Sequence, residues 1–142
     1  IMPTLLALAG LPVPETVDGE NLLPLLRGQQ HLQRPRLHGE HAPCYSDAQD
    51  YHFLTDGAQK YIWRPLDGSE QLFDLAADPQ ECHDLAQDPA YAQDLDRWRA
   101  RLIRRLRGRP EGFTDGKQLI PGRAYPAVMP EARTRHENDI AT

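Results

Sequence analysis

The sequence is poor in several features that mark common classes of protein. Its two cysteines allow at most one disulfide and cannot form a four-thiolate metal site. Its longest apolar run, residues 5–9, is far shorter than the roughly 20 residues of a membrane-spanning helix. Its 16 basic residues are outnumbered by 21 acidic ones, so the chain has no overall positive field for a phosphate backbone. These absences argue against a membrane span and against nucleic acid as a partner.

Proline and glycine are frequent instead, with 13 and 10 residues among 142, and they predict many turns and short elements. Pro3 and Gly10 bracket a run of good helix formers and predict a two-turn helix. Its apolar residues lie almost all round it, which is typical of an element covered on several sides. Because the chain starts at Ile1, with nothing before this helix to cover it, we expect a fragment of a longer protein. After a loop, Asn21 predicts the cap of a short helical turn.

From residue 36 the pattern changes to short runs rich in aromatic and β-branched residues. The connections are short and contain Asp-Gly pairs, so the strands should form antiparallel hairpins. In the second strand, His52 and Leu54 should point to one face of the sheet and Tyr51 and Phe53 to the other. The four strands are predicted over residues 36–42, 50–55, 60–64 and 70–75, with turns at Asp56-Gly57 and Asp67-Gly68.

A long amphipathic helix is predicted to cover one face of this sheet. Asp88-Pro89 suits its first turn, and Gly108 suits its end. Arginines fill most of its polar positions, which is typical of a solvated or partner-facing surface. The apolar residues that recur at helical spacing are Tyr91, Leu95, Trp98, Leu102 and Leu106.

The expected fold is therefore α+β. A four-stranded antiparallel sheet is packed by a long C-terminal helix, preceded by a short helical segment and followed by an extended tail. Between sheet and helix, Asp78 and Glu81 have capping-box spacing and predict one helical turn, with Glu81 bonding back to the backbone of Asp78. The tail should lie along a surface up to about Pro130 and be partly disordered beyond it. The expected divisions are residues 1–35, 36–108 and 109–142.

His38-Gly39-Glu40-His41 is the most prominent polar cluster in the sequence. On a strand, His38 and Glu40 share a face, whereas His41 points to the other. We expect no self-contained metal site here, because a third ligand would have to come from His52, Cys44 or His83. Cys82-His83 has neither an orienting group nor an oxyanion donor in its pattern, so the chain alone predicts no catalytic centre.

The order of these motifs resembles that of type I sulfatases over roughly residues 1–125. Residues 1–14 and 17–26 are similar to the end of the sulfatase catalytic domain, an α/β domain. Three further groups of motifs resemble the smaller C-terminal sulfatase domain. In the sulfatase family, that domain is a four-stranded antiparallel sheet with a long helix packed on it. The three groups are His38-Gly39-Glu40-His41, then Leu54-Thr55-Asp56-Gly57 with Lys60-Tyr61-Ile62-Trp63, and Gln71-Leu72-Phe73-Asp74-Leu75 followed by Asp78-Pro79-Gln80-Glu81. One departure is Asp84, where relatives commonly carry asparagine.

Sulfatases use a divalent cation, calcium or magnesium, and a formylglycine made in a Cys/Ser-x-Pro/Ala-x-Arg motif. Neither Cys44 nor Cys82 is followed by that pattern, so we expect no formylglycine, cation or catalytic residue in this chain. The resemblance implies that the chain completes the catalytic domain and shapes the substrate cleft. His38, Glu40 and His41 are the candidates for the cleft.

The expected partners are the upstream catalytic domain of the same protein and, in the full-length enzyme, a sulfate-ester substrate. Apolar surfaces left exposed in a fragment also predict a homo-oligomer. Two alternatives stay open: a fragment of a related phosphonate or phosphodiester hydrolase, and a non-catalytic interaction module that has kept only the fold.

Overall fold

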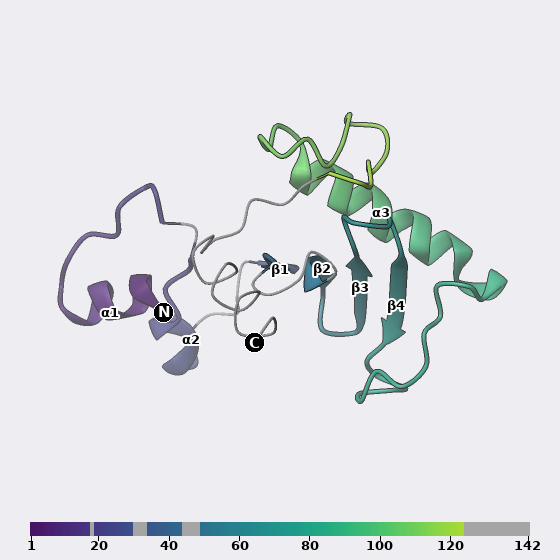
Figure 1. Ribbon diagram of the computed structural model, residues 1–142. Coiled ribbons are helices and arrows are strands. Elements are labelled where there is room, and N and C mark those ends of the chain that lie inside the picture. The colour runs from purple at the N-terminus through teal and green to yellow at the C-terminus, as the bar shows by residue number, and fades with distance from the viewer. Residues whose placement is uncertain (18, 30–33, 44–48, 124–142) are drawn as a thin grey trace, which may run out of the picture. The chain divides into compact units, whose positions relative to one another are not determined.

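The computed structural model describes residues 1–17, 19–29, 34–43 and 49–123. The chain divides into two compact units, Ile1–Pro35 and Arg36–Thr142. Figure 1 shows the first unit as two short helices and the second as a sheet with a long helix. None of the described helices is long and apolar enough to cross a membrane.

The first unit contains α1 (Met2–Leu8) and α2 (Leu23–Leu26). The hydroxyl oxygen of Thr4 accepts a hydrogen bond from the Leu22 amide at 3.0 Å, which ties the two helices together. The Asn21 side chain accepts from the Leu23 amide at 3.0 Å, close to its expected capping role. Many large apolar side chains of this unit are exposed: Ile1, Met2, Leu5, Leu8, Leu11, Val13, Leu25 and Leu26.

The second unit is built on a four-stranded antiparallel sheet, and this confirms the predicted fold class. The spatial order of the strands follows the chain order, so every connection joins neighbours. At the predicted Asp56-Gly57 turn the Asp56 carboxylate accepts from the amides of Ala58 and Gln59, and Gly57 has a φ of +89°. The strands are β1 (Leu37–His41), β2 (Tyr51–Thr55), β3 (Gln59–Trp63) and β4 (Glu70–Asp74).

One long helix covers the sheet, as predicted. A short 3₁₀ turn, η2 (Pro89–Tyr91), is capped by the Asp88 carboxylate, which accepts from the Ala90 amide at 2.9 Å. It leads into α3 (Ala92–Leu106), which Figure 1 shows beside β3 and β4. Helix and sheet bury a shared core of Leu54, Tyr61, Trp63, Leu72, Trp98, Leu102, Leu106 and Phe113.

Two polar contacts fix α3 on the sheet. Arg99 donates two hydrogen bonds to the Glu70 carboxylate, at 2.8 and 2.6 Å, and the buried Tyr61 hydroxyl donates to the same carboxylate. The Gln59 side chain accepts from the Trp98 indole at 2.8 Å. These bonds satisfy polar groups at the edge of the core and set where the helix lies along the strands.

The capping-box prediction for residues 78–81 was wrong. The segment forms a turn, and Glu81 has a φ of +57°. Its carboxylate binds the Lys60 ammonium at 2.8 Å, while the Asp78 carboxylate accepts from the His83 amide at 2.7 Å. Glu81 pairs with Lys60 on β3. Because Lys60 is distant in sequence, a local motif cannot predict this ion pair.

The segment after α3 belongs partly to the core. Phe113 is fully buried, and an isolated antiparallel bridge joins Thr114 to Leu119. The tail predicted for residues 109–142 therefore begins with residues that pack against the sheet and helix. Residues 124–142 lie outside the described part of the chain.

Candidate functional site

The strand register brings two of the three candidate cleft residues together with a third side chain. In the β1–β2 ladder, Glu40 lies opposite His52, and His38 lies two residues earlier on the same face of β1. His41 lies on the other face, where its ring stacks on Tyr51 at 5.4 Å. The structure therefore forms a cluster of His38, Glu40 and His52, and His41 is not part of it.

Gly39 allows this local arrangement. A Cβ atom at this position would overlap the ring of Phe53, its partner on β2. The backbone of β1 thus passes directly against the aromatic ring, while the neighbouring side chains of His38 and Glu40 point to the opposite face.

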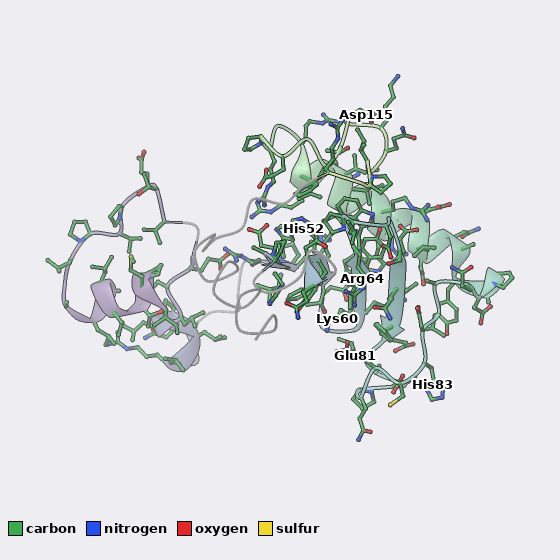
Figure 2. All side chains as sticks on the ribbon, in the orientation of Figure 1. His52, Lys60, Arg64, Glu81, His83 and Asp115 are labelled. Atoms are coloured by element: carbon green, nitrogen blue, oxygen red, sulfur yellow. The ribbon has the colours of Figure 1, made fainter. Side chains whose placement is uncertain are left out.

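His52 is the buried centre of the cluster. Its exposed fraction is 0%, and its ring packs against Trp63 and edge-on against Phe113. Its Nδ1 lies 3.3 Å from Nε2 of His38 and 3.5 Å from a carboxylate oxygen of Glu40. In Figure 2, His52 lies inside the second unit and well away from Glu81 and His83 on the loop that follows β4.

Two arginines from the end of α3 and the following turn complete the cluster. Arg109 donates to Glu40 at 2.6 Å and makes two further bonds to Glu111, at 3.2 and 2.7 Å. The Nε of Arg105 donates to Nδ1 of His38 at 3.3 Å. The sequence reasoning missed both arginines and Glu111, because only the fold brings residues 105–111 next to β1.

The surroundings favour the neutral form of both imidazoles. Burial lowers the pKa of His52 to about 4, and the neighbouring His38 and Arg109 act in the same direction. Burial also lowers the pKa of His38, against the opposing effect of Glu40. Since Arg105 donates to Nδ1 of His38, the single proton of the neutral His38 ring belongs on Nε2, from which it is donated to His52. The result is a hydrogen-bonded chain from Arg105 through His38 to His52.

The cluster also has the composition of a transition-metal site. The ligand atoms of His38, Glu40 and His52 all lie within 4.8 Å of one another. However, Arg109 is bonded to one of these ligands and Arg105 to another, and two guanidinium groups oppose a dication. Two imidazole nitrogens and one paired carboxylate are also a poor match for calcium or magnesium, which prefer a shell of oxygens. The cluster therefore does not fit the cation implied by the sequence resemblance.

The remaining candidate groups form no catalytic arrangement in the described part of the chain. Cys82 is exposed, and its Sγ is 3.7 Å from the carbonyl oxygen of Gln80. His83 lies 3.3 Å from the Asp78 carboxylate, in the loop described above. Cys44 lies outside the described residues.

Comparison with known proteins places the chain in a family. Residues 1–107 match the family model described as "N-sulphoglucosamine sulphohydrolase, C-terminal". An arylsulfatase of Clostridium perfringens is 37% identical over 126 residues, which cover 89% of this chain and 25% of that protein. The chain thus spans about a quarter of the length of this relative.

Solved structures agree with this match. The chain resembles the 2-O GAG sulfatase BT1596 with a TM-score of 0.72 and 27% identity, covering 94% of this chain and 27% of that one. It also resembles the phosphonate monoester hydrolase SpPMH of Silicibacter pomeroyi, with a TM-score of 0.62, 26% identity, and coverage of 74% of this chain and 24% of that one. The chain therefore belongs to the sulfatase family and corresponds to its C-terminal region.

Proposed function

We propose that this chain is the C-terminal part of a sulfate-ester hydrolase, in which it completes the catalytic domain and shapes the substrate cleft. The observation that carries this proposal is the family match over residues 1–107, which covers the first structural unit and the second as far as residue 107. In this proposal the rest of the enzyme supplies the formylglycine and the calcium or magnesium ion.

The first unit supports a role in completing a larger domain. Leu5, Leu8 and Leu26 are 59%, 61% and 75% exposed, although leucine is among the side chains most often buried. Such a dense apolar surface marks a contact region. In the proposal its partner is the upstream catalytic domain, and residues 1–35 are the last part of that domain. Without that domain, the same surface would drive self-association.

The second unit supports a role at the cleft. His38 and Glu40 are held by fixed partners, so their polar groups have defined positions, as a rim that selects a substrate requires. Exposed His41 offers a further polar group on the other face of the same strand. In the proposal these three side chains contact the organic part of the substrate, and none of them takes part in breaking the ester bond.

The experiment compares the full-length protein with this 142-residue chain on an aryl sulfate. We expect hydrolysis by the full-length protein and none by the chain alone. In the full-length protein, replacing His38, Glu40 and His41 together should change kcat/KM for at least one sulfate ester. An unchanged kcat/KM for every sulfate ester would refute the role of these residues in the cleft. Hydrolysis by the isolated chain would refute the proposal that the rest of the enzyme supplies the catalytic groups.

A second candidate function is phosphonate or phosphodiester hydrolysis, because the phosphonate monoester hydrolase SpPMH shares this fold at 26% identity. A phosphonate monoester tested beside the aryl sulfate separates the two. A larger kcat/KM for the phosphonate would favour this candidate. If neither ester is hydrolysed by the full-length protein, a non-catalytic interaction module becomes the better description.

A further inference from the structure

Four arginines, three on α3 and one just before β1, form a positive surface. Arg97, Arg101 and Arg104 follow one another on α3 at spacings of four and three residues, so they share one face of the helix. Arg36 lies immediately before β1 and is close enough to act electrostatically on Arg101. We call Arg36, Arg97, Arg101 and Arg104 the arginine patch.

Carboxylates neutralise little of this patch. Arg97 pairs with Asp94 at 2.7 Å, but Arg36, Arg101 and Arg104 make no ion pair within residues 1–17, 19–29, 34–43 and 49–123. Asp56 is the acidic group that acts on Arg101, and its carboxylate already accepts two backbone amides of the β2–β3 turn. Burial and the charges of Arg36, Arg97 and Arg104 all lower the pKa of Arg101.

Arg101 is fixed in place by the ring of Trp98. Its guanidinium lies over the ring of Trp98, 4.5 Å from the ring centre. Its Nη1 is buried, and it has no hydrogen-bond acceptor within the described residues. A buried N–H group normally has an acceptor, because leaving it unbonded costs free energy. A ligand that carries negative charge would reduce the repulsion among the four cations.

We propose that the arginine patch binds the sulfate or carboxylate groups of an acidic polysaccharide. Guanidinium groups match the planar or tetrahedral oxygens of such anions with paired hydrogen bonds. Arg97 and Arg104 are separated by about 10 Å along the helix axis, so the patch suits several charges along one chain better than a single small ion. The choice of a saccharide over an acidic protein segment rests on the function proposed above.

The patch would therefore hold a charged part of the substrate chain at a distance from the reacting ester. Such an additional contact raises affinity for a long substrate by making its binding multivalent, and it leaves the chemistry of a small substrate unchanged. Nucleic acid fits the patch less well, because the ring face of Trp98 is already covered by Arg101 and cannot stack on a base.

The test measures binding of a size-defined heparin oligosaccharide to the full-length protein by calorimetry. We compare the wild type with the double variant Arg101→Gln/Arg104→Gln. A second double variant, Arg27→Gln/Arg123→Gln, removes the same charge elsewhere and serves as the control. We expect the patch variant to lose affinity about tenfold and its salt dependence to fall by about two ions, with less than a twofold loss for the control.

Three results would overturn the proposal: no binding by the wild type, equal losses in both double variants, or tighter binding of a polyglutamate of matched charge. The last result would assign the patch to an acidic protein segment. Hydrolysis of a small aryl sulfate is measured in parallel and should be unchanged in the patch variant. If the wild type hydrolyses the aryl sulfate but does not bind the oligosaccharide, only the patch is refuted, whereas absent hydrolysis in the wild type refutes the proposed function.

Discussion

Acid should destabilise this fold through His52, before most of its carboxylates are protonated. The pKa of His52 is about 4 in the folded chain and 6.5 in an unfolded one, so protonation favours unfolding. The neutral ring contributes its full stability above pH 6.5, and this is lost as the pH falls through 6.5 toward 4. At about 1.4 kcal/mol per pKa unit, the loss approaches about 3 kcal/mol, and about 2.5 kcal/mol of it is reached by pH 4.5.

The measurement is the free energy of unfolding in urea between pH 7.5 and 4.5, for the wild-type chain and for His52→Gln. The variant should be less stable at pH 7.5 because it loses packing against Trp63 and Phe113, but its stability should fall less steeply with acid. His41→Gln, which alters a histidine on the opposite face, should keep the wild-type slope. Equal slopes in the wild type and His52→Gln, or an NMR titration of the His52 ring near pH 6.5, would refute the reasoning.

Three further changes test the packing and the exposed surface. Gly39→Ala should lower the free energy of unfolding by about 1–3 kcal/mol, because the new methyl group overlaps the ring of Phe53, and Phe53→Leu should recover part of the loss in the double variant. Glu70→Gln should cost about 1–2 kcal/mol in urea unfolding by weakening the paired bonds from Arg99; no change would mean that these bonds do not stabilise the helix on the sheet. Leu8→Gln should reduce self-association of the chain in sedimentation experiments, and a compact wild-type monomer at high concentration would contradict the contact role of this surface.

The secondary structure of the second unit was predictable because its signals are local. A short run rich in aromatic and β-branched residues over 51–55, followed by a turn pair at Asp56-Gly57, predicts a strand and its hairpin without reference to the rest of the chain. The apolar spacing of α3 is equally self-contained. The prediction was wrong at residues 78–81, because the Glu81 carboxylate binds the distant Lys60 ammonium and not the backbone of Asp78.

The candidate site depended on register, which no local pattern fixes. The strand periodicity placed His38 and Glu40 on one face of the sheet, but it left three candidates for a third polar side chain beside them. The pairing of Glu40 with His52 in the sheet identifies His52 as that side chain. Arg105 and Arg109 reach the cluster from sequence separations of 67 and 69 residues.

The contact between α3 and β1 therefore decides the charge of the cluster. If the two arginines were absent, the two histidines and the glutamate would have the composition of a metal site. With them, the same side chains form a neutral hydrogen-bonded chain beside a compensated ion pair. A shift of α3 by one residue would move the Arg105 guanidinium and change what the three side chains of the cluster can bind. The polar contacts from Arg99 to Glu70 and from Trp98 to Gln59 oppose such a shift, so the bonds that hold the helix also determine the chemistry at the far end of the sheet.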